Sequence, residues 1–278
     1  MAGDAFYQIS EKTNMEGDNG YDLRGWTIMT QEQLQFQKRM RQLEETSWQE
    51  CRFVFTDFLN EAEYSDVLMM GVPAGGMTSF GGYESASRVM VRFGDPETLG
   101  YEEPFPVTIL HISPLMEKFA DTLTHRDYLG AILNLGIERR VIGDILIDKA
   151  EAYVMCESRM AEYISENLTR VKHTSVKAVT VNSIPDDVRP KVICQDVLAG
   201  SSRIDAVAAQ VHHFSRSQAQ ELLHSGQVFI NGRVVQSASA QLHENDIVSV
   251  RHYGKFRYAG VSGETRKGNL RIRIERYV

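Results

Sequence analysis

The most regular alternation of hydrophobic and polar residues lies between positions 203 and 251, and it begins at helical spacing. Ile204, Val207 and Val211 recur three and four residues apart, as on the buried face of a helix. Ser202, just before them, is of a type that caps helix starts. The pattern therefore predicts a short amphipathic helix at the start of this stretch.

A second helix and a compact set of strands are expected directly afterwards. Ser215 can cap a helix over 216–225, and Gly226 is typical of the residue that ends one. Short runs of β-branched residues then indicate strands, and the Asn-Gly pair at 231–232 is a strong signal for a two-residue hairpin turn. We expect these strands at 228–230, 234–235 and 246–250.

Two longer runs after residue 251 predict a further β-hairpin, with strands over 255–261 and 269–277. In the second run Leu270, Ile272 and Ile274 alternate with charged residues. We therefore expect one face of this hairpin to pack and the other to be largely basic.

The centre of the chain alternates between strand and helix patterns. In order, we expect strand 107–112, helix 124–135, strands 144–147 and 152–155, helix 158–168 and strand 175–181. This order is the ferredoxin-like arrangement shared by many RNA-recognition modules. The strand at 152–155 lacks the paired aromatic residues on which the RRM stacks bases, so we do not expect this sheet to read single-stranded RNA directly.

The N-terminal part shows fewer regular patterns. Residues 1–25 lack periodicity, so we expect a disordered tail or a poorly specified extension. Capping-box spacings at 30–33 and 47–50 predict two successive helices. We expect the glycine-rich stretch 71–82 to be a loop or hairpin connection and 88–93 to be a strand. The second helix would carry a core-facing stripe of Trp48, Cys51, Phe55, Phe58 and Leu59.

Charge is distributed unevenly along the 278 residues, whose formal net charge is −7. Residues 203–278 hold 11 Lys and Arg against 6 Asp and Glu, a net charge of +5, and the rest of the chain holds 19 against 31, a net charge of −12. A basic C-terminal module on an acidic body is typical of a protein that binds RNA with one end.

The polar side chains of this basic module predict an RNA-binding face, although a solvated helix face is the alternative interpretation. Free backbone N–H groups at the start of a helix, guanidinium groups and amides can all bind phosphate oxygens. We expect the side chains of Arg203 and Arg216 to be exposed. The candidate residues are Arg203, Ser215, Arg216, Ser217, Gln218, Asn231, Arg233, Arg251, Lys255, Arg257, Arg266, Lys267, Arg271 and Arg273.

The order of short motifs in this module resembles the S4 RNA-binding domain over about fifty residues. The motifs are R-I-D at 203–205, S-R-S-Q-A-Q at 215–220, V-F-I-N-G-R-V-V at 228–235 and D-I-V-S-V-R at 246–251. The resemblance implies that the module binds structured RNA.

The tripeptide His125-Arg126-Asp127 matches the kinase catalytic motif in letters only, because no D-F-G motif accompanies it. We expect it to begin a helix, where Asp127 suits the helix dipole. Arg126, Arg139 and Arg140 are candidates for a second basic patch, with a solvated face as the alternative.

A longer pattern is similar to the bacterial YlmH family from about residue 58 to 278. It comprises F-G-G-Y-E at 80–84, the run from His125 to Arg140, I-G-D-I at 142–145 and G-E-T-R-K-G-N-L-R-I at 263–272. The resemblance implies contact with ribosomal RNA of the large subunit through the S4 domain. It also implies a role in ribosome-associated quality control that involves peptidyl-tRNA, and hence tRNA as a partner.

Together these patterns predict an α+β chain in four parts. They are an N-terminal tail and helical region (1–82), a central ferredoxin-like, RRM-like domain (83–182), a linker (183–200), and an S4 domain with an added C-terminal hairpin (201–278). We expect a monomer.

Other classes of protein fit the sequence less well. A pseudouridine synthase would need a catalytic domain around Asp205, and only a small meander and a hairpin follow it. We therefore expect no catalytic residue and no cofactor, and the scattered Cys51, Cys156 and Cys194 predict neither a metal site nor a disulfide. No apolar run is long enough for a membrane span, so we expect a cytoplasmic protein. A protein-directed adaptor that uses RNA only as an anchor remains the third hypothesis.

Overall fold

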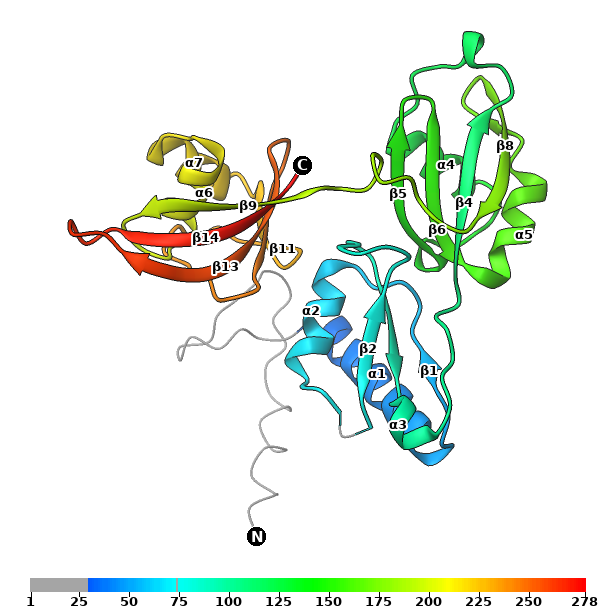
Figure 1. The fold of residues 1–278 in the computed structure, drawn as a ribbon, viewed down its shortest axis with the longest axis horizontal. Helices are drawn as coiled ribbons and strands as arrows, with labels where there is room; N and C mark the ends of the chain where they lie inside the picture. Colours follow the sequence, from blue (N-terminus) through cyan, green and yellow to red (C-terminus); the bar gives the residue numbers. More distant parts are fainter. Residues whose placement is uncertain (1–29, 74) are drawn as a thin grey trace. The chain divides into compact units, whose positions relative to one another are not determined.

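The structure, a computed structural model, describes residues 30–73 and 75–278 (Figure 1). Residues 42–278 form one compact unit, and residues up to 41 form another, whose described part is the beginning of helix α1 (Gln31–Gln49). The expected tail at 1–25 lies outside the described residues. The chain combines helices with antiparallel sheets, so the predicted α+β class is confirmed.

A small antiparallel sheet with the order β1-β3-β2 follows α1. The helix expected to start at Ser47 does not form, because α1 continues through this residue and the chain then enters strand β1. Ser47 is buried, and its hydroxyl donates to the carbonyl oxygen of Arg52 at 2.7 Å instead of capping a helix. The elements of this part are β1 (Val54–Phe55), α2 (Glu61–Met69), β2 (Met77–Phe80), β3 (Met90–Phe93) and α3 (Pro96–Leu99).

The central part has the predicted ferredoxin-like order, extended by one short edge strand. Its sheet runs β5-β6-β4-β8-β7, and all neighbouring strands are antiparallel. The elements are β4 (Val107–Pro114), η1 (Glu117–Phe119), α4 (His125–Leu133), η2 (Arg139–Val141), β5 (Ile142–Asp148), β6 (Glu151–Glu157), α5 (Ser158–Asn167), β7 (Arg170–Val171) and β8 (Thr174–Val181).

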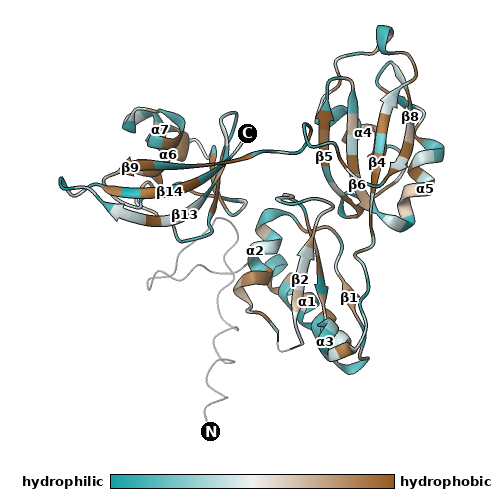
Figure 2. Cartoon of the chain, viewed as in Figure 1, coloured by the Kyte–Doolittle hydropathy of each residue, from teal (hydrophilic) through white to brown (hydrophobic). Residues whose placement is uncertain are grey.

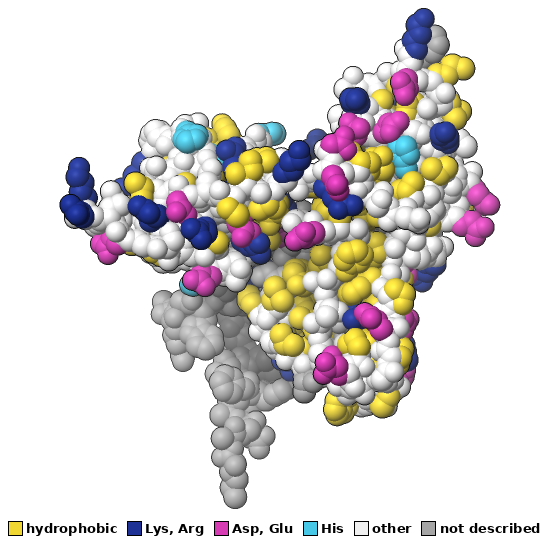
Figure 3. Space-filling view, viewed as in Figure 1, with side chains coloured by type: hydrophobic (Ala, Val, Ile, Leu, Met, Phe, Trp, Pro, Cys, Tyr) yellow, Lys and Arg dark blue, Asp and Glu magenta, His cyan; other side chains and the backbone are white. Residues whose placement is uncertain are grey.

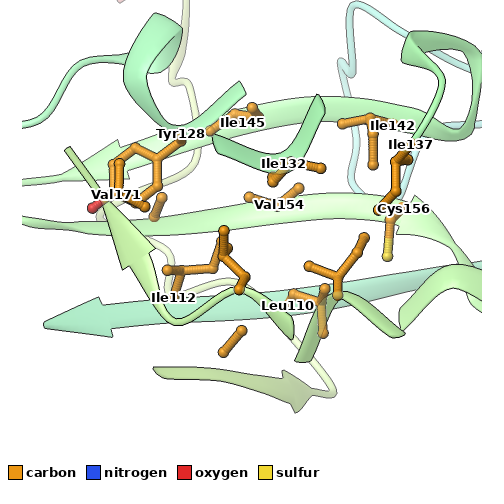
Figure 4. Close-up of a cluster of buried hydrophobic side chains, with 14 of the residues drawn as sticks. Leu110, Ile112, Tyr128, Ile132, Ile137, Ile142, Ile145, Val154, Cys156 and Val171 are labelled. Atoms are coloured by element: carbon orange, nitrogen blue, oxygen red, sulfur yellow. The ribbon is translucent and has the colours of Figure 1, made fainter. Parts of the chain in front are cut away.

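Helices α4 and α5 cover one face of this sheet and enclose its core (Figure 4). Tyr128 and Ile132 from α4 and Ile164 from α5 are buried against Leu110 and Val154 of the central strands. Full burial of such aliphatic and aromatic side chains stabilises each by roughly 1.5–3 kcal/mol. The central helices are therefore held by their apolar faces, which leaves their opposite faces available for polar contacts.

The C-terminal part is a six-stranded antiparallel sheet with the order β11-β10-β12-β13-β14-β9, on which two helices pack. Hydrophobic and hydrophilic residues are interleaved along its strands (Figure 2). Hydrophobic side chains from both helices and from the sheet pack together in a single buried core. The elements are β9 (Val192–Ala199), α6 (Ile204–His212), α7 (Arg216–His224), β10 (Val228–Ile230), β11 (Arg233–Val234), β12 (Ile247–Val250), β13 (Gly254–Glu264) and β14 (Leu270–Tyr277).

Strand β9 lies inside the stretch 183–200 that the sequence indicated as a linker. All eight of its residues pair with β14, from Ala199 opposite Leu270 to Val192 opposite Tyr277. Its sequence, V-I-C-Q-D-V-L-A, does not alternate between hydrophobic and polar residues, so no strand was predicted here, and most of its side chains are exposed. It forms because it hydrogen-bonds the otherwise open edge of β14, a contact more than 70 residues away in sequence.

Candidate nucleic-acid interface

A buried carboxylate joins the starts of the two helices of the C-terminal domain. Asp205 is 0% exposed, and it accepts two hydrogen bonds of 3.0 Å from the guanidinium group of Arg203. The Nε atom of Arg216 donates to the same carboxylate at 3.4 Å. Because a buried carboxylate without partners is strongly destabilising, these two arginines help hold Asp205 in the fold.

This triad corrects one expectation from the sequence. The side chain of Arg216 is exposed, at 67%, but that of Arg203 is only 32% exposed. Asp205 is in the first turn of α6, as the sequence indicated. Arg203 and Arg216 therefore combine a structural ion pair with a position at the surface.

The same two arginines line a surface hollow of about 620 Å³ together with Gln210 and Asn269. A guanidinium group has five N–H donors, and Asp205 accepts only some of them. Two arginines and one carboxylate leave a net positive charge at the rim. The hollow thus offers fixed cationic donors and neutral amides, which is a suitable set for phosphate oxygens.

The polar residues of α7 and of the following turn divide into two groups. Ser215 caps α7, because its hydroxyl accepts the N–H of Gln218 at 3.2 Å, whereas the side chains of Ser217 and Gln218 are exposed. Asn231 is occupied within the domain: its amide donates to Asp246 at 2.7 Å and accepts the N–H of Ile247 at 2.8 Å. Its contribution is therefore to hold the turn.

The second concentration of cations lies at the turn of the β13–β14 hairpin, where dark-blue side chains gather at the end of the strands (Figure 3). Arg266 and Lys267 occupy this turn and are exposed, and Arg271 is exposed on β14. Arg251 lies with its guanidinium carbon 5.7 Å from the ring centre of Phe229. In the part of the chain that the structure describes, none of these four has an ion-pair partner.

The remaining predicted cations are engaged with other side chains. Arg257 forms an ion pair with Glu275, which raises its pKa, and Arg273 lies 3.2 Å from Asp196. The ammonium group of Lys255 lies 4.8 Å from the ring centre of Tyr277. Lys255 and Arg233 also form ion pairs with Glu61 and Asp66, respectively.

The face of the central sheet opposite helices α4 and α5 is not available for stacking bases. Phe58, Tyr83 and Met90 from the preceding segment pack on Tyr153 and Met155 and bury them. An RRM uses this face of its sheet to stack RNA bases. Two features therefore disfavour base stacking on this sheet. Strand β6 lacks paired aromatic residues, and side chains of the preceding segment cover the face on which bases would stack.

The residues of the YlmH-like motifs hold this cover in place. Asp144 accepts hydrogen bonds from the Tyr83 hydroxyl at 2.8 Å and from the Ser87 N–H at 2.6 Å. Burial, reinforced by Asp144, raises the pKa of Tyr83. A Cβ atom at Gly143 would lie 2.7 Å from the ring of Phe58, so only glycine allows this close approach.

The three arginines of the expected second patch have different roles. Arg139 donates to the carbonyl oxygens of Ile142 and Gly143, and desolvation by burial, followed by the charge of Arg88, lowers its pKa to about 10. Arg140 forms ion pairs with Glu138 and Asp57. Arg126 alone is exposed without an ion-pair partner among the described residues.

The structure brings Arg126 together with two cations that sequence analysis did not single out, Arg170 and Lys172. They lie in the short hairpin after α5, and the only signal for them was the pair of basic residues in R-V-K at 170–172. In the described ranges, no group of His, Cys, Asp and Glu could hold a metal ion, and no helix is long and apolar enough to cross a membrane.

Two parts of the chain match known domain families. Residues 101–184 match a family described as "Putative RNA-binding domain in YlmH", and residues 202–248 match the S4 domain. The chain is similar to the ribosome-associated protein quality control protein P2 of Bacillus subtilis (strain 168), with 27% identity over 233 residues, 82% of this chain and 89% of that one. It is also similar to the solved cell division protein ylmH from Streptococcus pneumoniae, with 19% identity and a TM-score of 0.45 over 56% of this chain and 94% of that one. Both matched domains are of RNA-binding rather than catalytic families.

Proposed function

From the premise that this chain is a YlmH-type RNA-binding protein with an S4 domain, we propose that it docks on structured RNA of the large ribosomal subunit and catalyses no reaction. The observation that carries the proposal is the arrangement of cations on the S4 domain. Arg203 and Arg216 are fixed by the buried Asp205, and Arg266 and Lys267 at the hairpin turn form no ion pair with any residue that the structure describes.

Fixed and free cations contribute differently to such docking. Guanidinium groups already oriented by a carboxylate lose little conformational entropy when they bind a phosphate. Free cations at the hairpin turn add affinity by releasing counterions from the RNA, with little dependence on sequence. This combination favours recognition of a folded RNA by its shape and backbone.

The proposal extends to ribosome-associated quality control. The name of the Bacillus subtilis relative, quality control protein P2, supports this role, and the resemblance to the YlmH family adds peptidyl-tRNA as a partner. We expect the protein to act in the cytoplasm as a monomer.

The test is equilibrium binding of the full chain to purified large ribosomal subunits at several salt concentrations. Arg266→Glu with Lys267→Glu should weaken binding at least tenfold without changing the melting temperature, because both side chains are exposed and have no ion-pair partner within residues 30–73 and 75–278. The matched control is Lys149→Glu with Lys177→Glu, which reverses two exposed charges on the central domain instead. Equal binding by the hairpin variant and the unmodified protein would contradict the proposal.

A further inference from the structure

We propose that the central domain adds a second RNA contact, through a hollow between helix α4 and the β7–β8 hairpin that binds the phosphate backbone. This inference rests on the proposed function, because it assumes that the S4 domain brings the chain to RNA. It concerns the helical side of the domain and not the sheet, which is covered by Phe58, Tyr83 and Met90.

The hollow has a volume of about 550 Å³ and is lined largely by polar and charged side chains. Arg126 lies in the first turn of α4, and Arg170 and Lys172 lie in the hairpin. The side-chain amides of Asn134 and Asn167 complete the wall, and that of Asn167 already donates one hydrogen bond to the carbonyl oxygen of Tyr163 at 2.8 Å. Three cations with two amides around one depression can meet several oxygens of neighbouring phosphates.

The net charge of the hollow is positive because its lining holds three cations and one carboxylate, that of Asp127, which pairs with Lys172. The carboxylate of Asp127 accepts from the backbone N–H of Thr124 at 2.7 Å and from its hydroxyl at 2.6 Å. It also lies 2.9 Å from the ammonium group of Lys172. Within the described ranges, Arg126 and Arg170 have no acidic partner, so their charges are available to a ligand.

The floor of the hollow is open at Gly130. A Cβ atom built there would meet no atom within 4 Å, although the residue lies within helix α4. A larger residue at this position would therefore enter the hollow without disturbing the packed face of the helix, which Tyr128 and Ile132 form. This provides a way to block the hollow without removing any of its cations.

The experiment uses the full chain and purified large ribosomal subunits, with two central-domain variants. One is Arg126→Glu with Arg170→Glu, and the other is Gly130→Glu. We expect each to lower the affinity at least fivefold, and the double variant to reduce the slope of log affinity against log salt by about 1.4 to 1.8, since two phosphate contacts are lost. Photocrosslinking to 4-thiouridine-labelled ribosomal RNA should label peptides 125–135 and 167–174, and Gly130→Glu should remove this labelling.

The outcomes separate this inference from the proposed function. If Arg266→Glu with Lys267→Glu weakens binding but both central variants bind like the unmodified protein, the second contact is overturned and the S4 docking stands. If the hairpin variant also binds normally, the proposed function itself fails. If the central variants lose affinity for whole subunits but not for naked ribosomal RNA, the hollow binds an acidic protein, and RNA as its ligand is overturned.

Discussion

Asp205 makes the two most characteristic arginines of the S4 domain poor choices for a simple charge-reversal test of RNA binding. Both contact the buried carboxylate, so a glutamate in place of either puts a negative charge beside it. Loss of RNA binding in such a variant would then report unfolding as much as a missing contact. The exposed, unpaired Arg266 and Lys267 avoid this problem.

We predict that Arg203→Glu lowers the free energy of unfolding by about 2–4 kcal/mol, since a buried ion pair that loses one partner leaves an uncompensated charge. Urea denaturation of the full chain, followed by the fluorescence of tyrosine and tryptophan, measures this. Arg271→Glu is the matched control, because Arg271 is exposed, and its change should stay within about 0.5 kcal/mol. Equal stabilities for the two variants would show that Asp205 does not depend on Arg203.

His212 gives the S4 domain a pH dependence of stability. Burial, followed by the charges of Arg276 and His213, lowers its pKa from 6.5 to about 4. The unfolded chain therefore binds more protons between these values, and stability is lost as the pH falls from about 6.5 to 4. Allowing for its partial exposure, we expect a loss of roughly 1–2 kcal/mol.

Melting temperatures at pH 7 and pH 4.5 check this prediction, with His212→Phe as the comparison. Phenylalanine keeps the stacking on Phe214, whose ring centre lies 5.4 Å away, and removes a buried Nε2 atom that has no hydrogen-bond partner among the described residues. The variant should lose less stability on acidification than the unmodified protein. An equal loss would assign the acid sensitivity to other groups.

At the scale of secondary-structure elements, capping residues, turn residues and hydrophobic spacing predicted most of the helices and strands. These patterns failed where an element forms through contacts with residues far away in the sequence. Thr124 and Ser215 begin α4 and α7 as expected, because capping involves only neighbouring backbone groups. Asn231 and Gly232 both adopt positive φ, as the predicted two-residue turn requires. Strand β9 was missed because its partner, β14, is far away in sequence. Ser47 is buried where its hydroxyl lies near two carbonyl oxygens, that of Arg52 at 2.7 Å and that of the distant Phe93 at 3.1 Å, and its spacing to Glu50 did not reveal the second of these.

The candidate site was less predictable than the fold for the same reason. Residue type indicated a basic face, but only the folded chain shows which cations are already neutralised, such as Arg257 by Glu275. The hollow of the central domain combines Arg126 with Arg170, which are 44 positions apart and lie on different elements. No spacing rule within one helix or strand connects such a pair.

At the scale of the whole molecule, the core of the S4 domain and that of the central domain differ in whether they include residues from another part of the chain. The core of the S4 domain is built from residues of that domain alone, between Val197 and Ile274. The central sheet instead shares a second core with Phe58, Tyr83 and Met90 from outside residues 101–184, the range that matches the RNA-binding family.

We therefore predict that a fragment of residues 191–278 folds by itself and that one of residues 101–184 does not. The shorter central fragment would expose the apolar side chains of Ile109, Tyr153 and Met155, and should bind a hydrophobic dye and melt without a sharp transition. Calorimetry and dye fluorescence on both fragments measure this. A cooperative melting transition of fragment 101–184 without dye binding would contradict the prediction.

The close contact of Gly143 with Phe58 also limits which segments of such a protein can be exchanged between genes by recombination. A recombination event that transferred only the stretch of residues 101–184 would produce a chain with an uncovered apolar sheet, and exposed apolar patches of this kind favour aggregation. On this prediction, the upstream segment and the central domain are best transferred together. The S4 domain, by contrast, can be joined to unrelated partners and still fold.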